Sequence, residues 1–85
     1  MSALLTFPCQ FPIKVVGYNT PEFEVAVLTI FRKHVHDLGE SAISQKQSKN
    51  NRYLSITAVV NATSQEQLDA LYQDLSESTD VLFAL

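Results

Sequence analysis

The sequence predicts an α+β fold in which two helices cover one face of a four-stranded antiparallel sheet. Apolar residues alternate with polar ones over 11–17 and again over 53–62, the period of half-buried strands. Over 21–36 and 68–75 they recur every three or four positions instead, which is typical of helices that pack on one side. The resulting order is β-α-β-β-α-β, and right-handed crossovers place both helices on the same face. This is the ferredoxin-like plait.

The first strand is expected over 11–17, with Phe11, Ile13 and Val15 facing the core and Pro12, Lys14 and Val16 facing away. Thr20 can cap the helix that follows, and Pro21 suits its first position. We expect this helix over 21–36, ended by Gly39 in a left-handed conformation. Its predicted core face is Phe23, Val27, Ile30, Phe31 and His34.

The second half of the chain contains the strongest strand signal, Tyr53–Ala62, after a weak and polar candidate over 41–48. A capping box is expected in which the Thr63 hydroxyl and the Glu66 carboxylate each satisfy a free amide of the second helix. In the strand over 53–62, Ile56, Ala58 and Val60 are expected to face the core, and the residues expected to face away are Ser55, Thr57, Val59 and Asn61. The apolar stripe of the second helix is predicted to consist of Leu68, Leu71, Tyr72 and Leu75. A closing strand is expected in which Val81, Phe83 and Leu85 alternate with other residues.

Length and composition indicate one small soluble domain. We divide the 85 residues into an N-terminal arm, 1–10, and a single domain, 11–85. No apolar run approaches the ~18 residues of a membrane span, so no membrane association is expected. The single cysteine, Cys9, cannot form an internal disulfide, which favours a reducing cytoplasmic location.

The charge is small, negative and unevenly distributed. A net charge of −3 disfavours nucleic-acid binding, because affinity there depends on neutralising phosphates. An RNA-recognition domain would also need aromatic residues on its central strands, and that aromatic platform is missing here. Residues 41–63 carry Lys46, Lys49 and Arg52 and no acid, whereas 64–85 carry five acids and no base. This pattern is either two ordinary solvated faces or a self-complementary dimer or docking patch.

Several short motifs occur in a characteristic order. Residues 7–17 fit F-P-x-x-F-x-x-K-V-x-G, residues 53–63 fit Y-x-S-x-x-x-x-x-N-A-T, and residues 71–75 fit L-Y-x-x-L. Together they resemble the YbeD-like family of small bacterial proteins. The resemblance implies a fold similar to ACT-type regulatory domains, which bind amino acids; family members have no established activity. A homodimer is expected on a separate ground, because a chain of 85 residues is marginally stable and a shared interface would help. The ACT signature of an acid followed by Pro-Gly is replaced by Gly17–Pro21, so amino-acid binding does not carry over.

No group of residues is arranged for catalysis, and we expect neither an enzyme nor a cofactor. His34 and His36 lie about 200° apart on a helix and cannot share a metal ion. Cys9 has no base near it in sequence to activate it as a nucleophile. The two glycines do not form a phosphate-binding loop. Catalytic and metal-binding residues are therefore predicted to be absent.

Two hypotheses for function remain open. The first is a regulatory module that binds a small metabolite at the turn formed by Gly17, Tyr18, Asn19 and Thr20, with Lys14 and Tyr53 near a homodimer seam. Under it, Gly17→Val should block binding and leave the fold intact. The second is an adaptor that binds a protein, such as a metabolic enzyme, through the sheet face of Lys14, Val16, Tyr53, Ser55, Thr57 and Val59.

Overall fold

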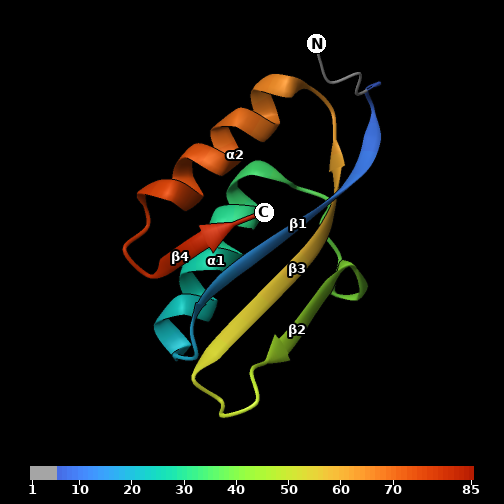
Figure 1. Cartoon of the computed structure of the whole chain (residues 1–85). Coiled ribbons are helices and arrows are strands. Elements are labelled where there is room, and N and C mark those ends of the chain that lie inside the picture. The colour runs from blue at the N-terminus through green and yellow to red at the C-terminus, as the bar shows by residue number, and fades with distance from the viewer. Residues whose placement is uncertain (1–5) are drawn as a thin grey trace.

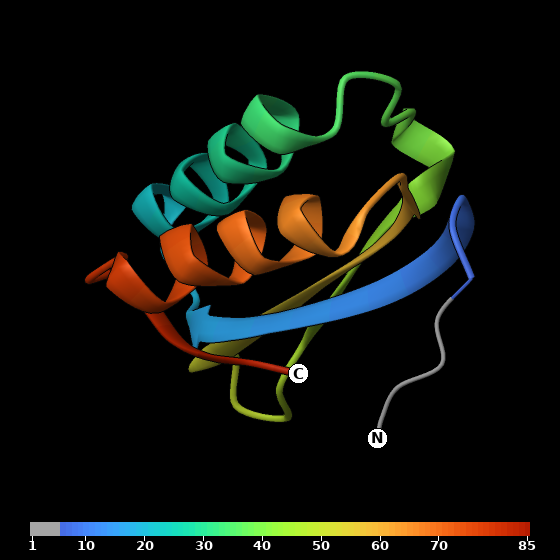
Figure 2. The ribbon, with the colours of Figure 1, turned by 90° about the horizontal axis from the view of Figure 1, so that it is seen from above.

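The computed structural model of the chain describes residues 6–85. Its elements are β1 (Cys9–Tyr18), α1 (Pro21–His34), a short 3-10 turn (Glu40–Ala42), β2 (Ile43–Gln47), β3 (Tyr53–Ala62), α2 (Gln65–Glu77) and β4 (Val81–Ala84). The strands form one antiparallel sheet in the order β2-β3-β1-β4. Both helices lie on the same side of it, as two layers (Figures 1 and 2). The predicted α+β ferredoxin-like fold is confirmed.

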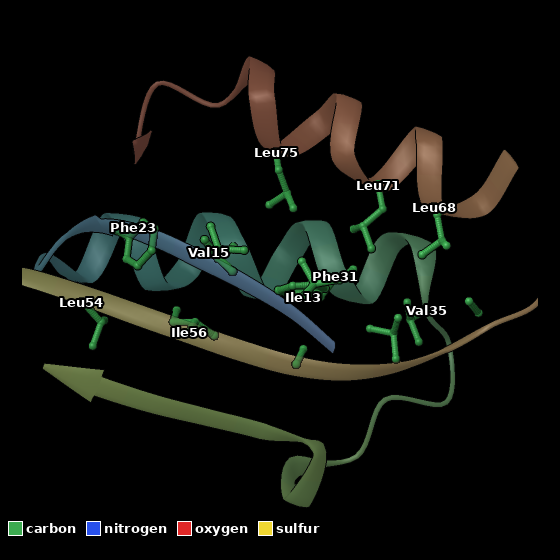
Figure 3. Close-up of a cluster of buried hydrophobic side chains, with 14 residues drawn as sticks. Ile13, Val15, Phe23, Phe31, Val35, Leu54, Ile56, Leu68, Leu71 and Leu75 are labelled. Atoms are coloured by element: carbon green, nitrogen blue, oxygen red, sulfur yellow. The ribbon is translucent and has the colours of Figure 1, made fainter. Parts of the chain in front are cut away.

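The core lies between the helices and one face of the sheet. In β3 every second residue from Leu54 to Ala62 is at most 4% exposed, so the predicted alternation is confirmed. Figure 3 shows the helix side chains pointing toward these strand residues. The buried set is Ile13, Val15, Phe23, Val27, Phe31, Val35, Leu54, Ile56, Ala58, Val60, Ala62, Leu68, Leu71 and Leu75.

Helix α1 begins as predicted but ends earlier. The Thr20 hydroxyl accepts a hydrogen bond from the Phe23 N–H at 3.1 Å, which is the expected cap. At the other end the helix stops at His34, because Val35 turns to an extended conformation (φ −129°) and buries its side chain in the core. Gly39 has φ −89°, so the predicted left-handed glycine stop is wrong.

The cap of α2 is shifted by one residue from the predicted position. Ser64, not Thr63, is the N-cap, and its hydroxyl accepts from the Gln67 N–H at 3.1 Å. The Gln67 side chain in turn accepts from the Thr63 N–H at 2.7 Å. Glu66 has no part in this cap. Strand pairing reaches Ala62, opposite Cys9, so the helix starts one residue later than the sequence motif predicts.

The other three strands, β1, β2 and β4, depart from the prediction. β2 covers only Ile43–Gln47, and β1 begins at Cys9, inside the predicted arm 1–10, whose first five residues lie outside the described part of the chain. In β4 a bulge sets Val81 opposite Gly17 but Phe83 opposite Val16. The extra residue rotates the strand, so Val81 and Ala84 pack against the core. The predicted shared face of Val81, Phe83 and Leu85 is therefore wrong.

Candidate functional site

The face of the sheet that carries no helix, which we call the open face, brings together all six residues of the predicted interaction surface. Strand pairing sets Lys14 opposite Thr57, and Val16 between Ser55 and Phe83. Directly paired residues point to the same side of a sheet, so these side chains form one continuous surface. Each of Lys14, Val16, Tyr53, Ser55, Thr57 and Val59 is exposed or half-exposed.

Charge is unevenly divided between the strands and the rest of the chain. All nine acidic residues lie in the helices, in the 3-10 turn or in the segments directly following a helix. The four strands and the β2–β3 turn contain none, yet they hold four of the six lysines and arginines: Lys14, Lys46, Lys49 and Arg52. The part of the open face around Lys14 and Lys46 is consequently basic in a protein whose net charge is −3. One acid reaches the other end of this face, where the Asp37 carboxylate accepts from the Asn61 side chain at 3.0 Å.

Large apolar and aromatic side chains are exposed around these cations. Tyr18 and Tyr53 are paired across β1 and β3 and stack with their ring centroids 5.4 Å apart. Phe83 is 50% exposed and Val59 39% exposed. The register places Phe83 beside Val16. This arrangement is not evident from the sequence, because a bulge has no clear signature in a four-residue strand. The open face therefore carries cations on β1 and β2 and exposed apolar side chains on β3 and β4.

The turn from Gly17 to Thr20 is already bonded within the protein. The Asn19 backbone N–H donates to the Arg52 carbonyl at 2.9 Å, and its side-chain amide donates to the Asn51 carbonyl at 3.1 Å. The Thr20 hydroxyl caps α1. Tyr18 is 52% exposed and belongs to the tyrosine stack. These contacts tie the turn to the β2–β3 hairpin.

Gly17 is buried rather than open to a ligand. A Cβ atom built on it would lie 2.4 Å from the ring of Phe23 and 2.7 Å from the backbone oxygen of Asp80. The close approach that glycine permits here is therefore to the protein's own helix. The expectation that Gly17→Val leaves the fold intact is wrong.

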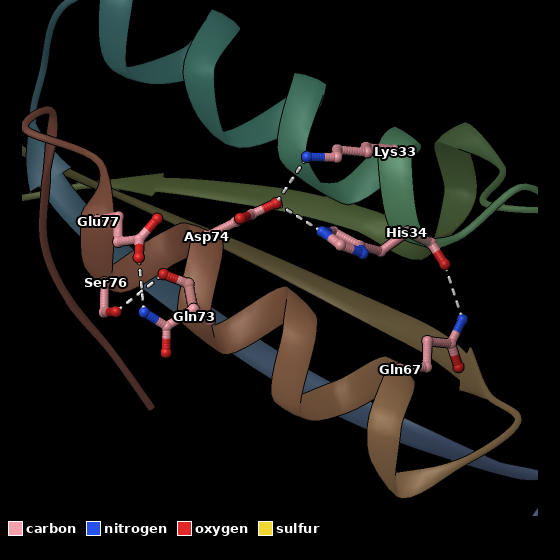
Figure 4. Close-up of polar contacts among 7 residues, drawn as sticks. All are labelled: Lys33, His34, Gln67, Gln73, Asp74, Ser76 and Glu77. Carbon is pink, nitrogen blue, oxygen red and sulfur yellow. Dashed lines mark hydrogen bonds and ion pairs between the residues drawn. The ribbon is translucent and has the colours of Figure 1, made fainter.

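A polar cluster joins the two helices on the other side of the molecule (Figure 4). The Asp74 carboxylate accepts from the His34 ring Nε2 at 2.7 Å and pairs with the Lys33 ammonium at 3.3 Å. The Gln67 side chain donates to the His34 carbonyl at 2.8 Å. His34 lies at the core edge as predicted, but its partner Asp74 is 40 residues away and could not be found from sequence. His36 is exposed beyond the end of α1.

This cluster predicts a pH-dependent stability. The hydrogen bonds from His34 and then Lys33 lower the pKa of the Asp74 carboxyl. The ionised Asp74 carboxylate therefore stabilises the folded state in full when the pH is above the ordinary carboxyl pKa. This contribution is lost as the pH falls through the lower pKa that the carboxyl has in the folded protein. Asp74→Asn should therefore reduce the free energy of unfolding at pH 6 but much less at pH 3, measured by urea denaturation. Glu66→Gln, on the same helix and exposed, is the control; a loss independent of pH in Asp74→Asn would contradict the assignment.

Within residues 6–85, no group of three or more histidine, cysteine, aspartate or glutamate side chains is placed to hold a metal ion. In the same residues no helix is long and apolar enough to cross a membrane.

Comparison with known proteins identifies relatives along the whole chain. A family model described as "Protein of unknown function (DUF493)" matches residues 2–85. The UPF0250 protein NE1487 of Nitrosomonas europaea is 37% identical over 83 residues, covering 98% of this chain and 95% of the relative. The UPF0250 protein NMC1112 of Neisseria meningitidis serogroup C is 41% identical over 75 residues, covering 88% of this chain and 82% of the relative. The predicted resemblance to the YbeD-like family is confirmed.

The fold also matches a solved structure. The solution structure of protein HP0495 from H. pylori superimposes with a TM-score of 0.73 at 14% identity, covering 99% of this chain and 88% of that one. At this identity the likeness supports the fold alone.

Proposed function

This chain belongs to the DUF493 family of proteins of unknown function, and we propose that it is a non-enzymatic adaptor that binds an acidic segment of a partner protein on the open face of its sheet. The observation that carries the proposal is the division of charge, which leaves the strands and the β2–β3 turn with four cations and no acid. Exposed apolar side chains among the cations, such as Val59 and Phe83, are typical of protein interfaces. A cytoplasmic location fits the single cysteine.

A partner protein fits this face better than a second copy of the chain does. If two open faces packed against each other, Lys14 and Lys46 of both copies would be enclosed in one interface whose strands supply no acid to pair with them. Like charges brought together in an interface cost several kcal/mol. The homodimer expected from sequence would need a different surface, such as an edge strand, and would leave the open face free for an acidic partner.

An acidic protein also fits better than RNA. The middle of the open face carries Lys14, Ser55 and Thr57, while Tyr18 and Tyr53 sit at one end and stack on each other. Single-stranded RNA is bound by aromatic residues that accept successive bases, together with a continuous positive groove. Lys14 and Lys46, which lie on the same side of the sheet, are a weak match for a phosphate backbone and a good match for one or two carboxylates.

The alternative, a regulatory metabolite-binding module, has less support from the geometry. The polar groups of the turn from Gly17 to Thr20 are bonded to the hairpin and to α1, and Gly17 is covered by Phe23. Metabolite binding at this turn therefore rests on the likeness to ACT-type domains. Partner binding, in contrast, is supported by the cations and the exposed apolar side chains of the open face itself.

The proposal is tested by selecting peptides on the immobilised protein from a phage library tiled from bacterial proteins. The enriched peptides should contain aspartate or glutamate next to apolar residues. Lys14→Glu should weaken their binding about tenfold or more, which corresponds to ~1.4 kcal/mol. Arg32→Glu makes the same charge change on the exposed side of α1 and should leave binding unchanged.

Three results would overturn the proposal. One is an enriched set of peptides without acidic residues. Another is binding that survives Lys14→Glu but is lost in Arg32→Glu, which would move the interface to the helices. The third is tighter binding of a polyuridine RNA than of any selected peptide at physiological salt, which would make the open face a nucleic-acid surface.

A further inference from the structure

Strands β1, β3 and β2 run side by side (Figure 1). Residues of these strands and of the adjoining turn line a small hollow in the open face. It has a volume of about 250 Å³, which lies below the ~300–1,000 Å³ of pockets that enclose drug-sized ligands. The largest ligand that fits this hollow is a single side chain or a small acid. The lining residues, which we call the lysine pocket, are Lys14, Val16, Lys46, Gln47, Ser48, Tyr53, Leu54 and Ser55.

Apolar and cationic groups occupy distinct positions in the lysine pocket. Lys46 pairs with Ser55, and Ser55 pairs on its other side with Val16. Lys14 lies two residues before Val16 on the same face of β1, so the two lysines approach the pocket from different strands. Tyr53 forms a further part of the lining and is held by its stacking on Tyr18.

The two serine hydroxyl groups of the lysine pocket already have partners. The Ser48 hydroxyl donates to the Asn50 side chain at 3.1 Å and accepts from the Tyr53 N–H at 3.0 Å. The Ser55 hydroxyl donates to the Lys46 carbonyl at 3.3 Å. The two ammonium groups differ from them: within residues 6–85 the carboxylate ion pairs are those of Asp74 with Lys33 and His34, and neither Lys14 nor Lys46 forms one.

We propose that the lysine pocket is the anchor point of the open face and binds one carboxylate side chain, a glutamate or aspartate, of the docked partner. The carboxylate lies between the ammonium groups of Lys14 and Lys46, and its methylene stem contacts Val16. This inference rests on the proposed docking function and adds to it the group that is recognised. Hydrogen bonds from the two ammonium groups to one carboxylate are charge-assisted and therefore stronger than neutral ones. The neighbouring apolar surface strengthens them further, because it keeps water away and lowers the local dielectric constant.

The test uses N-acetyl-glutamate amide, a capped glutamate side chain, and N-acetyl-glutamine amide, its neutral counterpart of nearly the same shape. Each is titrated into the whole ¹⁵N-labelled protein while the amide signals of Lys46, Tyr53 and Ser55 are followed by NMR. The capped glutamate should give saturable shifts at these amides, and the capped glutamine should give shifts about fivefold smaller or none. Lys46→Gln should abolish the effect, whereas Lys49→Gln, which removes the same charge from the adjacent turn, should retain it.

The possible failures are distinguishable. Equal losses in Lys46→Gln and Lys49→Gln would mean general electrostatic attraction and would overturn the anchor, while acidic peptides could still be selected on the open face. Equal shifts from the two capped amino acids would overturn it as well. Binding of free glutarate tenfold tighter than capped glutamate would overturn the assignment to a partner's side chain and indicate a small-acid site. If the capped glutamate bound in the lysine pocket but no acidic peptide was ever selected, the docking function would fail instead.

Discussion

Replacing Gly17 by valine is expected to lower the free energy of unfolding by about 3 kcal/mol or more, the upper part of the range for overpacked cores. The added Cβ would meet the ring of Phe23 at 2.4 Å and the backbone oxygen of Asp80 at 2.7 Å. Neither neighbour can move cheaply, because Phe23 is only 1% exposed and the oxygen belongs to the backbone. A domain of this size has a total stability of roughly 4–13 kcal/mol, so the loss is a large share of it.

The second glycine of the chain provides a matched control. A Cβ on Gly39 would have no atom within 4 Å, and neither glycine has a positive φ. Gly39→Ala should therefore be neutral or stabilise by about 0.4–1 kcal/mol through the unfolded chain. Urea denaturation of the two variants separates the effects. Equal stability of Gly17→Val and the natural protein would show that α1 does not pack against β1 as described.

Phe31→Ala is expected to destabilise the protein by about 3–5 kcal/mol, through lost burial and the cavity left behind. The Phe31 side chain is fully buried on α1, between the helix layer and the sheet (Figure 3). In a domain of this size, ~3 kcal/mol corresponds to a fall of roughly 12–24 °C in the melting temperature.

Val25→Ala on the same helix is the control for that prediction. Val25 is 65% exposed, and surface substitutions usually change stability by about 0.5 kcal/mol or less. Thermal unfolding followed by circular dichroism should therefore give a large shift for Phe31→Ala and almost none for Val25→Ala. Similar shifts in the two variants would contradict the assignment of the core face of α1.

The central elements were predictable because local signals and burial agree there. Strand β3 has the predicted bounds, Tyr53–Ala62, since its strict alternation corresponds to one buried and one open face. The start of α1 was predictable for the same reason: Thr20 and Pro21 both favour a helix N-terminus, and the hydroxyl of Thr20 makes the expected bond. The conformation of β3 and of the start of α1 depends on residues adjacent in sequence and on a single face that packs against the core.

What failed depends on contacts between distant residues. The bulge in β4, which brings Phe83 beside Val16, arises from pairing with β1 at the other end of the chain. Lys46 was noted only as part of a charge pattern, because its place beside Lys14 requires the register of both β2 and β1 against β3. The ligand hypothesis for Gly17 overlooked Phe23, which fills the space that the glycine leaves. None of these contacts can be predicted from a short sequence motif.

The most direct test of the proposed function is to map an acidic peptide, selected on the protein, by NMR chemical-shift perturbation. We expect the largest changes on the amides of Lys14, Ser55, Thr57 and Val59, and we expect them to disappear in Lys14→Glu. Exposed residues of α1 and α2, such as Arg32 and Glu66, should be unaffected. Changes concentrated on the helices, with the open face unperturbed, would contradict the central claim that this basic sheet surface is where the protein meets its partner.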